Sequence, residues 1–269
     1  MRHTDRALVL ARGLGRRMRK DDHGVQLTAD QQRAAEAGLK ALMPIDGRPF
    51  LDYVPGSLAE AGLRSVGLVI GPGADPVRSH YANLTTPVSL DFIVQPEARG
   101  TADAVLAAED WAEDAPFLAL NADNLYPVQV LRDLVALQEP GLPVFDREDL
   151  IASSNIPPER VQSFALLEVD DGVLTRIVEK PTDADMPGAG EPMLVSMNCW
   201  RFDSRIFSAC RDVEPSPRGE FELPLAVGLA LRRGVQFRAV PARGPVLDLS
   251  RRADTAEVAR RLRGAHLAP

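Results

Sequence analysis

Short apolar runs alternate with amphipathic stretches along the first half of the chain, and this pattern predicts strands joined by helices. The predicted strands cover residues 7–10, 66–70, 88–94 and 117–120. The predicted helices cover residues 29–37, 49–61, 101–111 and 128–138, and residues 40–45 form a short extended run. Strands that alternate with helices typically build a parallel sheet covered on both faces.

Two of these helices carry boundary signals. Thr28 and Gln31 have the spacing of a capping box, and Gly38 can end the helix that they begin. Pro49 suits the first position of the next helix. Pro55 lies inside that helix, and we expect it to kink or split the helix because proline lacks the backbone N–H.

The second half changes character. Two apolar runs, 164–169 and 173–179, flank Asp170–Gly172 and predict a hairpin. The remaining predicted strands cover 193–202, 237–240 and 246–249, the helices cover 221–233 and 255–262, and 181–192 forms a loop. The predicted fold class is therefore α/β: a Rossmann-like, mostly parallel sheet with helices on both faces, plus a small antiparallel subregion.

Composition limits the classes of protein. The 269 residues, 45% of them hydrophobic, suffice for one domain over 1–269, with a first half at about 1–138, a second at about 139–250 and a terminal helix at 251–269. A net charge of −7 argues against nucleic-acid binding. No apolar run is long enough for a membrane span or a signal peptide, so we expect a cytoplasmic protein with no membrane partner. Cys199 and Cys210 are expected to be reduced and structural.

The segment after the first strand concentrates glycine and arginine. Gly13 and Gly15 allow a tight turn that exposes backbone N–H groups to an anion, and five cations lie between residues 12 and 20. The lysine of a Walker loop is absent, and Met18 stands where a dinucleotide fingerprint needs its third glycine. A triphosphate-binding loop and a solvated arginine-rich turn both fit these residues.

Residues 8–18, Leu-Val-Leu-Ala-Arg-Gly-Leu-Gly-Arg-Arg-Met, resemble the signature loop of the sugar-phosphate nucleotidylyltransferase family, Leu-Ala-Ala/Gly-Gly-x-Gly-Thr-Arg-Met/Leu. Arg17 matches the catalytic arginine of that family. Arg12 stands where the family has a small residue, and Arg16 where it has threonine. The resemblance implies that the nucleotide contacts Leu10, Ala11, Gly13, Gly15 and Arg16.

Further segments resemble that family in the same order. Lys40, in residues 39–44, matches a phosphate-binding lysine, and residues 20–38 before it form an insertion near the site. Residues 95–104 resemble the base-reading element, which implies nucleotide contacts from Gln95, Gly100 and Thr101; an ordinary helix start is the alternative.

The acceptor and metal segments follow. In the Glu-Lys-Pro match, the resemblance gives sugar hydroxyls to Glu179 and the sugar phosphate to Lys180. It places Asn198 and Ala165 beside the sugar, and it makes Asp123 and Asp248 the ligands of Mg²⁺. Glu220–Leu223 is given a structural role first.

The resemblance implies a GT-A-like nucleotidyltransferase domain that moves a nucleoside monophosphate from a nucleoside triphosphate to a sugar 1-phosphate with Mg²⁺. Two alternatives stay open: a nucleotide-sugar-binding protein that has lost catalysis, and transfer to a phosphorylated amino alcohol. The sequence identifies neither the base nor the sugar, and it allows but does not require a homo-oligomer.

Overall fold

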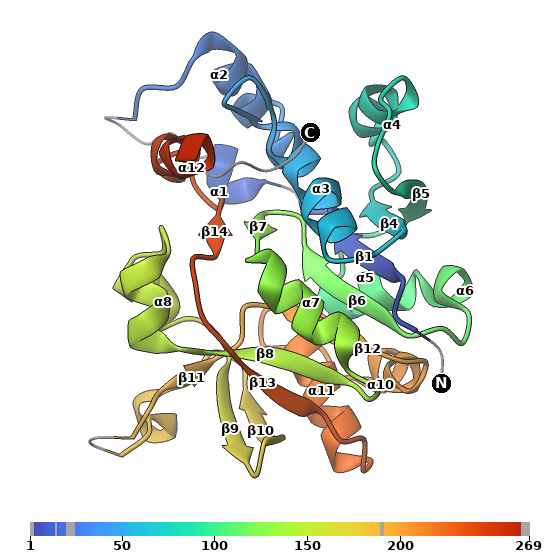
Figure 1. Ribbon diagram of the computed structural model, residues 1–269, viewed down its shortest axis with the longest axis vertical. Coiled ribbons are helices and arrows are strands. Elements are labelled where there is room, and N and C mark those ends of the chain that lie inside the picture. Colours follow the sequence, from blue (N-terminus) through green and yellow to red (C-terminus); the bar gives the residue numbers. More distant parts are fainter. Residues whose placement is uncertain (1–2, 14, 20–24, 189–190, 265–269) are drawn as a thin grey trace.

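The computed structural model describes residues 3–13, 15–19, 25–188 and 191–264 (Figure 1). The strands are β1 (Arg6–Leu10), β2 (Pro44–Ile45), β3 (Arg48–Pro49), β4 (Ser65–Ile70), β5 (Ser89–Val94), β6 (Phe117–Asn121), β7 (Asn124–Leu125), β8 (Gly141–Asp146), β9 (Leu166–Asp170), β10 (Val173–Val178), β11 (Leu194–Val195), β12 (Cys199–Phe202), β13 (Arg238–Ala242) and β14 (Leu247–Asp248). The α-helices are α1 (Arg16–Arg19), α2 (Ala29–Glu36), α3 (Tyr53–Glu60), α4 (Asp75–Ala82), α5 (Thr101–Leu106), α6 (Glu109–Ala112), α7 (Val128–Ala136), α8 (Arg147–Ser153), α9 (Pro158–Val161), α10 (Arg205–Asp212), α11 (Leu223–Arg232) and α12 (Asp254–Gly264). The short 3₁₀ helices are η1 (Lys40–Leu42), η2 (Phe50–Asp52) and η3 (Asp183–Asp185).

One ten-stranded sheet runs through both halves of the chain, in the order β11-β9-β10-β13-β8-β12-β6-β1-β4-β5. The strands of the first half, β6, β1, β4 and β5, are all parallel. The α/β class is confirmed. The second half differs from the prediction, because its antiparallel strands continue the same sheet: β12 runs antiparallel beside both β6 and β8.

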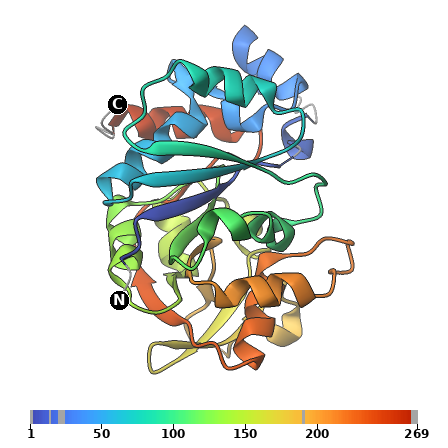
Figure 2. The same ribbon diagram turned by 90° about the vertical axis from the view of Figure 1, so that its right-hand side faces the viewer.

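Both faces of this sheet are buried, as expected for strands made of continuous apolar runs. Along β6, Phe117 packs on one face of the sheet and Leu118 on the other. Helices α5, α10 and α11 contact one another and lie on the side that Figure 2 turns to the reader. Helices α3 and α7 pack together on the opposite face. The sheet therefore lies between two helical layers.

Short sequence signals correctly predicted the boundaries of several elements. Thr28 and Gln31 form the expected capping box of α2. The hairpin between β9 and β10 turns at Asp171 and Gly172, which both have positive φ. The helix predicted over 49–61 is split, as expected, into η2 and α3, and Pro55 lies in the first turn of α3, where its missing N–H has no partner to lose.

Two segments that were each predicted as one element form two elements in the structure. Residues 101–111 were expected as one helix but form α5 and α6. Residues 193–202 were expected as one strand, yet Asn198 adopts a positive φ of 56° and separates β11 from β12. Residues 40–42, expected to be extended, form η1. Within the described residues, no helix combines the length and apolar character needed to cross a bilayer.

Candidate active site

A cavity of about 450 Å³ lies at the carboxyl ends of β1, β5 and β6, where open α/β sheets place their ligands. Many residues predicted from the sequence line it: Leu10, Ala11, Gly13, Gly15, Arg17, Lys40, Gln95, Gly100, Thr101, Asp123, Glu179 and Asn198. Lys180, Ala165 and Asp248 do not line it. Arg16 belongs to α1, but its side chain is outside the described part of the structure.

The loop after β1 has a shape that requires glycine at one position. Gly15 has a φ of +60°, and a Cβ there would lie 2.9 Å from the carbonyl oxygen of Gly38. The turn leads into α1, which carries Arg17. The Arg17 side chain is exposed, lines the cavity and forms no ion pair with any described residue. Its charge is therefore available to an anionic ligand.

Two aspartates from distant segments lie beside each other. Asp123 follows β6, lines the cavity, and forms an ion pair with Lys40. Asp248 lies on β14, which pairs with β7, and the backbone N–H of Leu249 donates to the carbonyl oxygen of Asp123 over 2.9 Å. Burial raises the pKa of Asp248, and the charge of Asp123 raises it further. The two carboxylates thus share one electrostatic environment.

Asp248 lies beneath the cavity rather than in its wall, since it is 5% exposed. One carboxylate oxygen accepts a hydrogen bond from Arg160 over 2.6 Å, and the other accepts from Asn124 over 3.1 Å. Arg160 also pairs with the buried Asp254 at 2.8 Å. Asp248 therefore belongs to a buried ion network that its sequence motif did not indicate.

Mg²⁺ binds a few carboxylate oxygens together with phosphate oxygens and water. No cluster of three or more acidic, histidine or cysteine side chains suited to a metal occurs among the described residues. Asp123 borders the cavity, and Asp248 keeps a lone pair beyond those bound by Arg160, Asn124 and Ser250. These residues fit an ion that arrives with a polyphosphate.

Gln95 and Gly100 occupy the end of the cavity beside β5 and α5. Gln95 is 1% exposed, and its amide nitrogen donates to the carbonyl oxygen of Gly100 over 3.1 Å and to Asp103 over 2.7 Å. Gly100 has a φ of +124°, and a Cβ there would lie 2.3 Å from the carbonyl oxygen of Phe221. Backbone packing therefore requires glycine at position 100, independently of any contact with a ligand.

Carboxylates gather in the part of the cavity next to Thr101, whose hydroxyl accepts a hydrogen bond from the backbone N–H of Leu223 over 2.8 Å. Glu179 and Glu222 both line it. Burial raises the pKa of Glu179 to about 8, and a hydrogen bond to Glu222 adds to the shift. Burial opposes ionisation of Glu222, but hydrogen bonds from Glu179 and Arg218 outweigh it and lower the pKa. One proton is therefore shared between the two carboxyl groups near neutral pH.

The other residues that were predicted to contact the acceptor are Lys180, Asn198 and Ala165. Lys180 is 41% exposed in its side chain and lies 3.8 Å from Glu222, just outside the lining. Asn198 lines the cavity, and its side-chain oxygen is buried without a hydrogen-bond partner among the described residues. Ala165 is 4% exposed within the core, so its methyl group faces protein rather than the cavity.

Sequence reasoning missed three acceptor-side lining residues, Arg218, Glu220 and Glu222. Arg218 forms an ion pair with Glu222 at 2.7 Å, and Glu222 is also the N-cap residue of α11. The segment was given a structural role because helix starts commonly carry acids. The arginine two residues before the first acid was the signal that a charged pocket wall was present.

The insertion before Lys40 is tied into the structure by a buried arginine. Arg252 is 5% exposed and donates to the carbonyl oxygens of Met18 over 2.8 Å and Arg19 over 3.3 Å. It also donates to the side chain of Gln32 on α2 over 3.2 Å. The inserted helix thus supports the helix that carries Arg17.

Comparisons with known proteins agree with this geometry. The model of the family described as nucleotidyl transferase matches residues 27–246. The UTP–glucose-1-phosphate uridylyltransferase AglF of Haloferax volcanii is 29% identical over 258 residues, covering 95% of this chain and 96% of the relative. A glucose-1-phosphate thymidylyltransferase of Streptomyces antibioticus is 29% identical and covers 95% of this chain and 65% of the relative.

Solved structures share the fold. A UDP-glucose pyrophosphorylase complexed with UDP-glucose superimposes with a TM-score of 0.75 at 17% identity, over 97% of this chain and 99% of the other. The inositol-1-phosphate CTP transferase from T. maritima gives 0.73 at 18% identity over the whole of both chains.

Proposed function

This chain belongs to the nucleotidyl transferase family, and from that premise we propose that it moves a nucleoside monophosphate from a nucleoside triphosphate to a sugar 1-phosphate. The observation that carries the proposal is a single cavity whose wall combines three kinds of chemistry. Amide and backbone groups lie at Gln95, free cationic charge lies at Arg17, and carboxyl groups lie at Glu179 and Glu222. This combination suits a base, a polyphosphate and a polyhydroxylated acceptor.

The transfer brings anions together. A phosphate oxygen of the acceptor forms a bond to the α-phosphorus, while the bond from that phosphorus to the bridging oxygen of pyrophosphate breaks and its electron pair leaves with pyrophosphate. The protein must hold these groups in line and neutralise their charge. We assign Arg17 to the departing pyrophosphate, Lys40 to the triphosphate, and Lys180 to the attacking phosphate, with Arg218 beside it.

The carboxyl groups of the cavity are assigned to the acceptor. A sugar presents hydroxyl groups that both donate and accept hydrogen bonds, and Glu179 with Asn198 offers complementary groups there. The side-chain oxygen of Asn198 has no described protein partner, so a sugar hydroxyl can supply it. We therefore propose that Glu179 and Asn198 orient the acceptor, while Ala165 acts through core packing.

Asp123 and Asp248 would hold Mg²⁺, with Asp123 facing the cavity and Asp248 supporting it from below. When bound, the ion supplies positive charge to phosphate oxygens. Lys40 now neutralises Asp123. Triphosphate oxygens offer Lys40 an alternative partner, so its ammonium group can move from the carboxylate to the phosphate as substrate enters.

The test is pyrophosphate release with a panel of triphosphates and phosphorylated acceptors. Arg17→Ala and Asp123→Asn should each reduce turnover by about 10²–10³-fold, by analogy with loss of one preorganised charge elsewhere. Arg243→Ala is the control, because the Arg243 side chain is 88% exposed and does not line the cavity. Near-native release in both site variants would contradict the assignment.

The same panel separates two alternatives. Binding of a nucleotide sugar without pyrophosphate exchange would identify a protein that has lost catalysis. Turnover with a phosphorylated amino alcohol but with no sugar 1-phosphate would change the acceptor class and leave the nucleotide site as proposed.

A further inference from the structure

Arg12 is the residue of the site that the proposed chemistry does not use. It lies two residues after the end of β1 and lines the cavity. Its Nε donates a hydrogen bond to the backbone carbonyl oxygen of Gln95 over 3.2 Å, which anchors the guanidinium beside the end of β5. No ion pair joins Arg12 to any described residue. An arginine has five N–H donors, so most of its donors remain free at the cavity wall.

The fold makes room for this side chain. A Cβ on Gly71, which follows β4, would lie 2.8 Å from both Cζ and Nε of Arg12. Any other residue at position 71 would therefore have to displace the guanidinium. The Arg12 side chain thus packs across the end of β4 against Gly71 and reaches the backbone of Gln95.

This place is remote from the predicted phosphate and metal groups. In the sheet, β5 lies three strands from β6, in the order β6-β1-β4-β5. Neighbouring strands are about 4.8 Å apart, so the ends of β5 and β6 are about 14 Å apart. Asp123 follows β6, whereas the anchor of Arg12 follows β5. Arg12 is therefore positioned for the part of the nucleotide farthest from the reacting phosphorus.

The hydrogen bonds of Gln95 determine which of its side-chain groups can bind a ligand. Both hydrogens of its amide nitrogen are used, one by the carbonyl oxygen of Gly100 and one by Asp103. Because both partners are acceptors, the orientation of the amide is fixed. Gln95 can then present only its oxygen to a ligand, while Arg12 presents only donors.

We propose that Arg12 selects the base of the donor nucleotide by donating to its carbonyl oxygen, with the Gln95 oxygen accepting from the adjacent ring N–H. Uracil, thymine and guanine each carry that pair of groups. Adenine and cytosine carry an amino group beside an unprotonated ring nitrogen, which would place donor against donor and acceptor against acceptor. This inference rests on the proposed function and names its nucleotide class.

The experiment measures binding and turnover separately. Wild type, Arg12→Ala and Arg12→Lys are titrated calorimetrically with UTP, dTTP, GTP, ATP, CTP and pyrophosphate in the presence of Mg²⁺. Wild type should bind at least one of the carbonyl-bearing nucleotides on the order of tenfold more tightly than ATP and CTP. In Arg12→Ala that ratio should fall towards one, and pyrophosphate affinity should stay unchanged.

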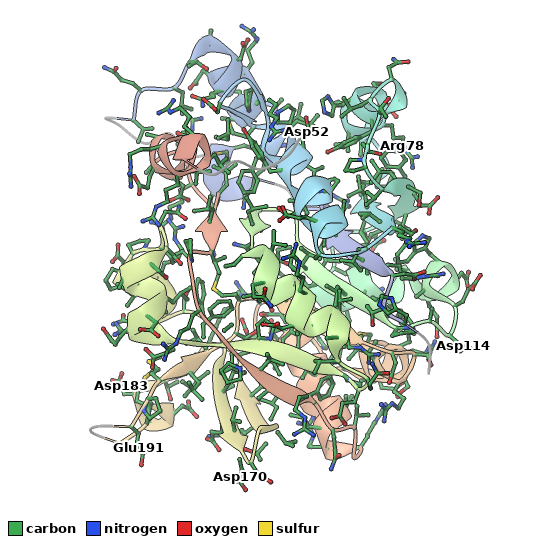
Figure 3. The ribbon with its side chains drawn as sticks, in the orientation of Figure 1. Asp52, Arg78, Asp114, Asp170, Asp183 and Glu191 are labelled. Carbon is green, nitrogen blue, oxygen red and sulfur yellow. The ribbon has the colours of Figure 1, made fainter. Side chains whose placement is uncertain are left out.

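Arg12→Lys keeps the charge but loses the planar donor group, so it should also lose most of the selectivity. It serves in place of the alanine variant if that variant does not fold. Arg78→Ala is the matched control, because Arg78 on α4 stacks on Phe92 and does not line the cavity (Figure 3). It should leave the ratio unchanged.

Three results would overturn the inference: wild-type preference for ATP or CTP, an unchanged ratio in both Arg12 variants, or an equal loss of affinity for all nucleotides and pyrophosphate. The last would make Arg12 a phosphate contact. Selective binding without turnover would contradict the proposed function and leave the base assignment in place. Turnover together with an unchanged affinity ratio between the nucleotides in both Arg12 variants would support the proposed function and contradict the role of Arg12 in base selection.

Discussion

Glu179 and Glu222 show how a few neighbouring groups set the chemistry of one part of the cavity. Two carboxyl groups that share a hydrogen bond in a partly buried place cannot both ionise easily. Burial, followed by the hydrogen bond to Glu222, raises the pKa of Glu179 to about 8, and Arg218 stabilises the charge on Glu222, so the shared proton stays nearer Glu179. A protonated carboxyl group can donate to an acceptor oxygen, which an ionised one cannot.

This proton makes the stability of the protein depend on pH. An ordinary glutamate, as in the unfolded chain, titrates near 4.5, so between that value and about 8 the folded protein holds a proton that the unfolded chain has lost. The free energy of unfolding should therefore decrease as pH rises through this window. Glu179→Gln cannot ionise, and its melting temperature relative to wild type should rise between pH 5 and pH 8.

Thermal unfolding across that range checks this expectation. Glu214→Gln is the control, since Glu214 is exposed and forms no hydrogen bond with a described residue. The shared-proton interpretation is wrong if Glu179→Gln and wild type keep a constant difference in melting temperature.

At the scale of elements, α1 is too short to hold its own position. Four residues make little more than one turn, and an isolated turn is not stable in water. Its last carbonyl oxygens are instead bound by Arg252, which also holds α2 through Gln32. The end of α2 presses against the loop at Gly15. The inserted helix therefore acts as a support for Arg17.

Gly15→Ala should disturb this support. The new Cβ would clash with the Gly38 carbonyl oxygen in a backbone conformation that disfavours side chains, and such strain costs about 1–3 kcal/mol. We expect that loss in the free energy of unfolding by denaturant titration, together with a higher KM for the triphosphate. Gly73→Ala is the control, because nothing lies within 4 Å of its added Cβ. Equal stability of the two variants would show that the loop adapts freely.

At the scale of the whole molecule, the site depends on contacts between segments far apart in the chain. Arg160 joins Asp248 and Asp254, and all three are less than 10% exposed. A buried ion network contributes little net stability when intact, because desolvation offsets attraction, but removal of one partner leaves unpaired charge. The network thus fixes β14 beside β7, and so holds Asp248 beside Asp123.

Arg160→Met removes the cation and leaves two buried carboxylates without it. The free energy of unfolding should fall by about 3–5 kcal/mol. Arg176→Met is a matched control, since Arg176 also bridges two acids, Glu168 and Asp185, but in an exposed place where pairing has little effect on stability. Denaturant titration measures both. A similar small loss for both variants would contradict the role given to the buried network.

Local patterns were sufficient wherever neighbouring residues decide the conformation. The capping box at Thr28, the turn at Asp171 and Gly172, and the apolar run of β1 were readable because each depends on a few adjacent side chains. Motif matching also placed Arg17, Lys40 and Asp123 at one cavity. Their assigned roles stay predictions until the variants are measured.

The sequence by itself determined the α/β class, the parallel first half and the glycine-bearing loop after β1, because periodicity and backbone sterics act over short distances. Only the tertiary structure decided that antiparallel strands extend the same sheet, that Arg160 forms an ion pair with Asp248, and that Arg12 donates to the backbone at the end of β5. These outcomes depend on which distant residues meet, and the free energy of such contacts arises from burial that no local pattern encodes.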